Sequence, residues 1–315
     1  MRYGKALLYF NGGASQNLIN IYMAIFGQLF INGIIAGSIY ALVAAGFSLI
    51  YATNRFIHFA HGTMVTVSAY FLYWLFVMLG VNFYLASLLT IIFAGFLGWL
   101  SYVGFYKQLK KKKASNAVLL IASVGLLILM ENLMLLIFGA DVKSLNLLEI
   151  NKGYEIGGAI ITGLQIVIVV SALILLAGLF LFVRYSKLGK TMRAVADNPS
   201  LANILGINSD KIAQISFALG SALAGFAAIL IALEQNIEPV MGLNLIIKGF
   251  TGAIIGGATS LPGSILGSYL LGLVENFGIW YLPSGYKDAI AFVLLFLFLL
   301  IKPSGILGIW KGIKE

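Results

Sequence analysis

Few residues in this chain could do chemistry inside a folded core, and two histidines are the first of them. His58 and His61 lie three residues apart in NRFIHFAHGTM, a spacing that can place both on one face of a helix. Two imidazoles could begin a metal site, but a chain without cysteine needs further ligands from distant carboxylates. We therefore expect no metal here. Asn54, His58 and His61 are interpreted either as a structural turn or as a polar segment that lines a cavity.

Two carboxylates interrupt long apolar runs, and both could also do chemistry. Glu131 stands beside Asn132 in LLILMENLMLLIFG, and Glu275 stands beside an asparagine in LLGLVENFGIW. A charge in hydrocarbon is costly unless it is paired or hydrated. Each carboxylate could line a translocation path or relay protons, or could be hydrogen-bonded between helices or protonated. The marginal Lys248 is the candidate cationic partner of Glu131.

Nucleotide chemistry is not expected within this chain. A phosphate-binding loop requires G-x-x-x-x-G-K-[ST], and the Gly-Lys-Thr at 189–191 has Arg184 where the first glycine belongs. An intramembrane enzyme would need paired acids, a metal cluster or a nucleophile with a base. Since Glu131 and Glu275 are the acids well inside apolar runs, we expect neither an enzyme nor a bound cofactor.

The elements that must position these residues are membrane helices. The chain is 61% hydrophobic and only 10% charged, with a mean hydropathy of +1.00. Residues 159–183 carry no charge, and at about 1.5 Å of rise per residue such a run outspans a hydrocarbon layer of about 30 Å. Long uncharged runs indicate helices, whereas a barrel would alternate in short segments. We predict an all-α, polytopic integral membrane helical bundle.

Nine spans are expected, within a range of eight to ten. They cover 27–51, 63–80, 83–106, 117–139, 159–183, 212–233, 240–256, 264–282 and 286–301.

Glycines cluster between 249 and 282, where broken or re-entrant helices could replace two full spans. Small residues let helices pack closely in lipid, and Gly-Gly-Ala-Thr-Ser-Leu-Pro-Gly should break a helix. Close packing alone would explain the glycines. The alternative is a discontinuous helix whose Gly256, Gly257 and Thr259 line a translocation path.

Basic residues set the predicted orientation. They concentrate at 107–113, 184–211 and 302–314, three segments that fall on one side in a nine-span count. The opposite loops are richer in acids, so the basic side is predicted to be cytoplasmic. The amino-terminal Arg2 and Lys5 would then lie outside unless residues 6–54 cross twice. This bias also accounts for the net charge of +9, so no nucleic-acid partner is expected.

A cytoplasmic segment follows the fifth predicted span. In SKLGKTMRAVADNPSLANILGINSDKI, Asp197 or Asn198 can cap a helix that takes a proline in its first turn and stops at Gly206. Its apolar face comprises Leu201, Ile204 and Leu205. A helix this short is unstable alone, so it must pack either on its own bundle or on a separate soluble subunit.

At these residues the chain resembles the permease subunits of prokaryotic ATP-binding cassette importers for branched-chain amino acids. The resemblance runs from NGIIAGSIYALVAAGFSLIY and NRFIHFAHG through RYSKLGKTMRAVADNPSLANILGIN to FTGAIIGGATSLPGSILG and KPSGILG. It implies a single transmembrane permease domain over 1–315 in the cytoplasmic membrane. It also implies that the loop at about 186–210 is a coupling helix docking on an ATPase, with a second permease and an external solute-binding protein as partners.

Two other functions stay open at this point. Permeases with similar motifs carry urea, amides, nucleosides or sugars, and the binding protein that would select among them is a separate chain. A stand-alone channel or ion-coupled carrier would need no ATPase, and Glu131 would then be its first candidate for a coupling group.

Overall fold

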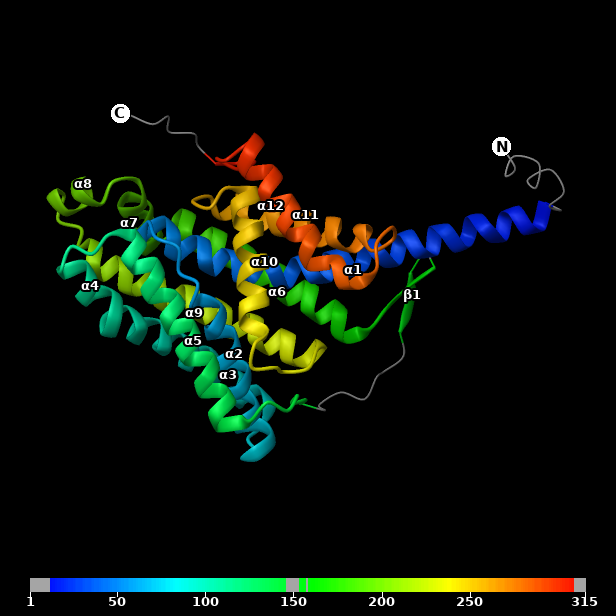
Figure 1. Ribbon diagram of the computed structural model, residues 1–315, viewed down its shortest axis with the longest axis horizontal. Helices are drawn as coiled ribbons and strands as arrows, with labels where there is room; N and C mark the ends of the chain where they lie inside the picture. Colours follow the sequence, from blue (N-terminus) through cyan, green and yellow to red (C-terminus); the bar gives the residue numbers. More distant parts are fainter. Residues whose placement is uncertain (1–11, 146–152, 157, 309–315) are drawn as a thin grey trace.

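The computed structural model describes residues 12–145, 153–156 and 158–308, and within these ranges nearly all of the chain is helical (Figure 1). Its α-helices are α1 Gly12–Asn54, α2 His61–Tyr73, α3 Phe83–Ser101, α4 Lys107–Lys111, α5 Asn116–Phe138, α6 Gly163–Tyr185, α7 Lys187–Asp197, α8 Pro199–Ile204, α9 Ser209–Glu234, α10 Met241–Gly256, α11 Leu261–Gly278 and α12 Lys287–Ile301. Two π-helical stretches, η2 Trp74–Met78 and η3 Tyr102–Tyr106, extend α2 and α3, and a 3-10 turn, η4 Ser284–Tyr286, precedes α12. Strands β1 Tyr154–Ile156 and β2 Ala159–Ile161 form an antiparallel hairpin.

The bundle has the predicted helical class, and the described residues hold seven or eight candidate spans, against nine predicted within a range of eight to ten. Seven described helical segments are long and apolar enough to span a membrane, and α10 with α11 adds one bent pair. By length and composition the described residues therefore offer seven candidate spans, or eight if the pair is one span. The predicted spans 240–256 and 264–282 both exist as helices, but glycines at their junction fold them against each other. The broken helices expected in this region are thus confirmed.

The second half of helix α1 lies at the centre of the bundle, whereas its amino-terminal part projects beyond the other helices (Figure 1). The whole of α1 has 43 residues, roughly 64 Å at the helical rise, and it is one continuous helix rather than two crossings. Helix α11 packs along it where glycines let the backbones approach. A Cβ at Gly37 would lie 2.9 Å from the Cα of Tyr269, and the Tyr269 hydroxyl is 3.0 Å from Ser38 Oγ. Small residues at this seam provide the close packing expected in lipid.

A sharp bend of 117° joins α10 to α11. Gly256 ends α10, and Gly257 follows with φ +111°, a left-handed conformation that favours glycine. Ser260 then caps α11, because its hydroxyl accepts a hydrogen bond from the Gly263 amide at 3.2 Å. The chain beyond α12 returns to this bend, where the Ile306 amide donates to the Ile255 carbonyl at 2.8 Å.

Contacts between loops place the basic segments on one face, as predicted. Lys107 forms an ion pair with Asp210 at 2.8 Å, and Arg55 donates to the carbonyl of Ala196. The segment from Lys302 to Gly308 is hydrogen-bonded to the α10–α11 bend. Residues 259–262 of that bend line a cavity together with Arg184 of α6. By the positive-inside rule this is the cytoplasmic face.

On the opposite, outer face, the loop after α5 pairs with the loop after α9 through a β-bridge between Lys143 and Ile237. The β1–β2 hairpin is held to the same end of the bundle, because the Ile160 amide donates to Gln28 of α1 at 2.8 Å. Arg2 and Lys5, whose side of the membrane is predicted above, lie outside the described residues.

Candidate functional site

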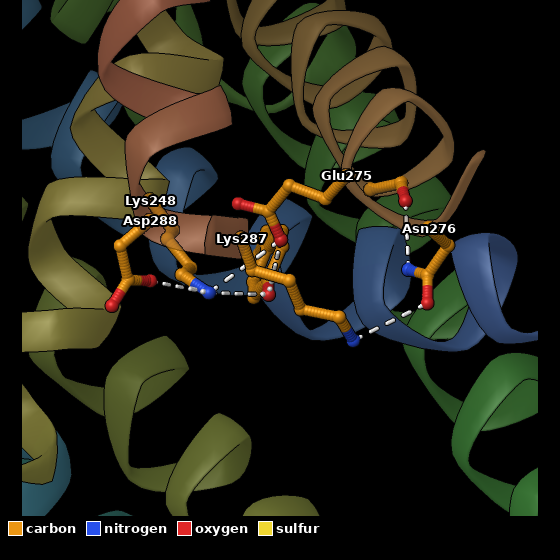
Figure 2. Close-up of polar contacts among 7 residues, drawn as sticks. Lys248, Glu275, Asn276, Lys287 and Asp288 are labelled. Carbon is orange, nitrogen blue, oxygen red and sulfur yellow. Dashed lines mark hydrogen bonds and ion pairs between the residues drawn. The ribbon is translucent and has the colours of Figure 1, made fainter. Parts of the chain in front are cut away.

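A cluster of charged side chains lies between helices of the bundle (Figure 2) and borders its outer face. Lys248 of α10 is 3.1 Å from Asp288 of α12 and 3.5 Å from Glu275 of α11. The Tyr40 hydroxyl of α1 donates to Glu275 Oε2 at 2.9 Å and accepts from Lys248 Nζ at 3.2 Å. Glu275 is only 1% exposed. The cluster therefore compensates a buried carboxylate while it joins four helices, and one carboxylate, Asp288, remains open to water.

The cluster borders a polar cavity of 570 Å³ on the outer face. Its walls come from α1, α10, the loop after α9, and the segment that leads into α12. Lys248 and Lys287 contribute positive charge, and Glu238 and Asp288 contribute negative charge. Figure 2 also shows Lys287 directed at Asn276, whose side-chain oxygen accepts its hydrogen bond at 3.4 Å. Opposite charges in one cavity suit a small ligand that carries both signs.

Glu275 was a predicted path residue, whereas its partners were not expected from the sequence. Lys248, the predicted candidate partner of Glu131, pairs with Glu275 instead. One signal could have identified it: Lys248 is the only lysine or arginine between Lys211 and Lys287. An isolated cation in so long an apolar stretch needs a carboxylate, and the one at 275 is close once α10 folds back on α11.

Replacing Lys248 with methionine is expected to lower the free energy of unfolding by about 3 kcal/mol, because it leaves the Glu275 carboxylate buried without its cation. Adding Glu275→Gln should restore most of the loss. Lys143→Met is the matched control: its partner Asp141 is largely exposed, so the cost should stay within about 1 kcal/mol. Denaturation in detergent measures the free energy of unfolding of Lys248→Met, of Lys248→Met with Glu275→Gln, and of Lys143→Met. Equal losses for Lys143→Met and Lys248→Met would contradict the prediction.

The predicted histidines lie in a packed aromatic region rather than beside the charged cluster. Both are fully buried. His58 Nδ1 is 3.0 Å from the Tyr106 hydroxyl, and the His58 ring lies 4.8 Å from that of Phe217. These contacts favour the structural-turn interpretation of the segment. Asn54 lies apart at the cytoplasmic end of α1, where its Oδ1 accepts from Lys110 at 2.7 Å.

Glu131 and Asn132 lie on α5, at the edge of the bundle. Helix α5 packs mainly on α2, whereas Glu275 belongs to α11 beside α1. The side chain of Glu131 is half-buried, and that of Asn132 is exposed and donates to the Ile128 carbonyl of its own helix at 2.7 Å. The two carboxylates singled out in the sequence thus belong to different parts of the bundle.

The predicted path residues Gly256, Gly257 and Thr259 occupy the α10–α11 bend on the cytoplasmic face. Thr259 lines a cavity of 430 Å³ together with the ends of α1 and α6 and part of α7. Arg184 and Arg193 are the charged groups of its lining.

The predicted path residues therefore lie in separate places. Glu275 lies near the outer cavity, the histidines lie in the core, and Glu131 and Asn132 lie on α5. The others lie at the cytoplasmic end of α1 and at the α10–α11 bend.

The cytoplasmic segment forms two short helices, α7 and α8. Ser186 caps α7 by accepting from the Gly189 amide at 2.9 Å, and Asn198 caps α8 by accepting from the Leu201 amide at 3.0 Å. Helix α7 buries its apolar face in a cluster made by Leu49, Met192, Val195, Ala202 and Ile212.

Helix α8 leaves its apolar face uncovered. Leu201, Ile204 and Leu205 are 51%, 81% and 71% exposed, and Gly206 ends the segment with φ +82°. Asp197, at the end of α7, is also exposed. We call Asp197, Leu201, Ile204, Leu205 and Gly206 the coupling surface. An apolar face that projects from the cytoplasmic side has no acyl chains to contact, so it is suited to a protein partner.

Known proteins resemble this chain over most of its length. Residues 29–299 match the family model described as "Branched-chain amino acid transport system / permease component". The high-affinity branched-chain amino acid transport system permease protein BraD of Pseudomonas aeruginosa is 35% identical over 89% of this chain and 95% of its own. The corresponding LivH protein of Escherichia coli is 33% identical over 90% and 96%.

The probable branched-chain amino acid transport permease protein LivH of Methanocaldococcus jannaschii is 30% identical, over 90% of this chain and 93% of its own. With its apolar helices, the chain is a multi-pass protein of the prokaryotic cytoplasmic membrane and a transport subunit. It belongs to the permease component family of branched-chain amino acid transport systems.

Proposed function

We propose that this chain is the transmembrane permease subunit of an ATP-binding cassette importer that moves leucine, isoleucine and valine into the cytoplasm. The observation that carries the proposal is the exposed apolar coupling surface on α8. The sequence shows no phosphate-binding loop, so the proposal takes its energy from a separate ATPase that docks on this surface. Helix α7 holds α8 against the bundle, so a push on Leu205 would pass to α1 and α9.

Branched-chain amino acids are the proposed substrates for two reasons. The relatives described above are named for transport of these amino acids. The outer cavity also offers a cation at Lys248 and a carboxylate at Asp288, which could receive the carboxylate and the ammonium group of an amino acid. Urea and sugars carry neither charge, so this lining favours an amino acid.

Alternating access is the proposed mechanism, and the packing of α1 against α10 supports it. The 570 Å³ cavity lies at the outer end of this seam and the 430 Å³ cavity at its cytoplasmic end. Between them the seam is closed, because the Gly249 backbone packs on Val43 so tightly that a Cβ would lie 2.7 Å from Val43 Cγ1. Movement of α10 about the glycine bend could open one cavity as the other closes.

The proposed partners are cytoplasmic ATPase subunits at the coupling surface, a second homologous permease in the membrane, and an external solute-binding protein. The binding protein would dock on the outer face, beside the β1–β2 hairpin and the outer cavity. It would set the affinity for the substrate, while the permease supplies the path.

Reconstitution tests this proposal. In liposomes that contain the chain with ATPase, second permease and binding protein, we expect ATP-dependent accumulation of labelled leucine, and no accumulation when any one component is omitted. Unlabelled isoleucine and valine should compete, whereas urea, nucleosides and sugars should not. Uphill leucine uptake by the purified chain alone would contradict the proposal and favour an ion-coupled carrier. If Glu131→Gln then lost that uptake, Glu131 would be identified as the ion-coupling group of such a carrier.

A further inference from the structure

A second cytoplasmic cavity, apart from the coupling surface and the α10–α11 bend, has a basic lining. It has a volume of 690 Å³ and lies between the end of α1, helix α4 and the start of α9. Its basic side chains are Arg55, Lys107, Lys110 and Lys111, and among the described residues of its lining Asp210 is the only acid. We call it the basic cavity. Its lining carries three more positive than negative charges.

The lysines of the basic cavity are arranged differently from lysines that merely obey the positive-inside rule. Lys107 is neutralised by Asp210 at 2.8 Å. The Lys110 ammonium turns inward, where it donates to the neutral Asn54 Oδ1 at 2.7 Å and lies 5.6 and 5.3 Å from the ring centroids of Phe56 and Tyr102. Asn54 fixes this ammonium without neutralising it, so a positive charge is held in place at the cavity wall.

The helical segment that carries the lysines of the basic cavity also exposes large aromatic side chains outside the cavity lining. Trp99 and Phe105 precede Lys107 on the same helical segment and are 39% and 49% exposed. The Trp99 indole donates to Gln214 at 3.2 Å, and Gln214 donates in turn to Asp210 of the cavity lining at 3.0 Å. An aromatic ring beside such a polar chain is typical of the membrane–water interface. The cavity therefore lies at the depth of the lipid headgroups.

We propose that the basic cavity binds the phosphate headgroup of an anionic phospholipid from the cytoplasmic leaflet. Lys110 and Lys111 would contact the phosphate, and the acyl chains would lie along Trp99 and Phe105. A free phosphate compound would satisfy the same cations, but it would make no use of the adjoining apolar surface. An ATPase would contact α8, which projects from the bundle, whereas the floor of the basic cavity includes Tyr102, a residue only 1% exposed.

Lipid binding at this position would brace the coupling segment. Pro199 of α8 and Ser209 at the start of α9 form part of the cavity lining, and Arg55 holds the carbonyl of Ala196 at the end of α7. A bound headgroup would restrain both ends of the segment that carries the coupling surface. Anionic lipid would then act as a structural cofactor for energy transfer, separately from substrate selection.

Quenching of Trp99 fluorescence can detect the lipid directly. The purified chain is placed in vesicles of phosphatidylcholine with either brominated phosphatidylglycerol or brominated phosphatidylcholine. A Trp99→Phe variant gives the background from the other three tryptophans. Preferential quenching of Trp99 by brominated phosphatidylglycerol is expected. Equal quenching by the two lipids would overturn the proposal.

Charge-removing variants then locate the site. Each lysine near an anionic headgroup strengthens binding about fivefold, so Lys110→Gln with Lys111→Gln should weaken the preference roughly 25-fold. Lys187→Gln with Lys190→Gln removes the same charge from the same face on α7, outside the cavity lining, and should leave the preference unchanged. If both double variants lost the preference for anionic lipid equally, the preference would reflect a general attraction between the basic face and anionic lipids. That result would overturn the proposed binding site.

Three controls keep the result specific. Lys110→Arg should retain the preference, and both double variants should unfold at the wild-type temperature in detergent, which separates binding from folding. Glycerol 1-phosphate should fail to displace the brominated lipid, and full displacement would reassign the cavity to a soluble phosphate compound. A double variant that loses ATPase association while it keeps the lipid preference would reassign it to a protein contact.

Discussion

Leucine uptake is expected to fall to background when Leu205 is replaced with aspartate. Leu205 is 71% exposed on the coupling surface, and a carboxylate there would be buried without a partner once an ATPase docks. Loss of one central apolar contact typically costs about 2 kcal/mol, which is roughly 30-fold in the dissociation constant. The measurements are ATPase co-purification and ATP-driven leucine uptake in proteoliposomes.

The matched control for Leu205→Asp is Tyr154→Asp. Tyr154 is a large exposed side chain on the β1–β2 hairpin, at the opposite end of the bundle. Its replacement should leave ATPase association unchanged. Helix α8 should also survive in the Leu205 variant, because Leu205 lies at its carboxyl end and the side chain packs on little of the bundle. If Leu205→Asp supported uptake at the wild-type rate, the proposal that the coupling surface transmits force from an ATPase would be wrong.

Replacing Gly256 with alanine is expected to destabilise the bundle by more than the Lys248 variant does. A Cβ at Gly256 would lie 1.7 Å from the Gly263 carbonyl oxygen and 2.1 Å from its carbon. Both are backbone atoms of the facing helix, so no side-chain rotation relieves the overlap, and α10 must separate from α11. We expect a loss above about 3 kcal/mol, with little folded protein in the membrane.

Gly178→Ala is the control for the glycine variant. Gly178 is also a helical glycine, on α6, but a Cβ there meets no atom within 4 Å. Alanine should be neutral or should stabilise the helix by as much as ~1 kcal/mol. Expression level and melting temperature in detergent compare the two variants. Similar melting temperatures would mean that the bend is not the tight contact between α10 and α11 described above.

Charge and hydropathy were enough to predict the class of fold and the gathering of the basic loops on one face of the bundle. These properties act locally, because lipid demands a long apolar run and the leaflet charge acts on each loop separately. The caps of α8 were predictable for the same reason: Asn198 acts on the Leu201 amide three residues away.

The charged cluster was not predictable, because it depends on the direction of a bend. Lys248 and Glu275 are 27 residues apart, and their contact requires α10 to turn by 117° at its glycines. Tyr40 is a further 208 residues from Lys248 and gives no sign in the sequence that it differs from other tyrosines. The count of nine treats 240–256 and 264–282 as separate crossings, because hydropathy measures apolar length and does not distinguish a full span from one arm of a folded pair.

During most of the synthesis of the chain, the glycine seam of α1 is not yet covered by α11. Helix α1 leaves the ribosome before the other described helices, yet its glycine seam is covered by α11, and Ser38 meets Tyr269 only 231 residues later. At about 5–20 residues per second this delay lasts roughly 10–50 s. Nascent chains halted before Leu261 would therefore expose the glycine seam of α1 to lipid. In this state the seam would be accessible to the membrane insertion and quality-control machinery of the cell.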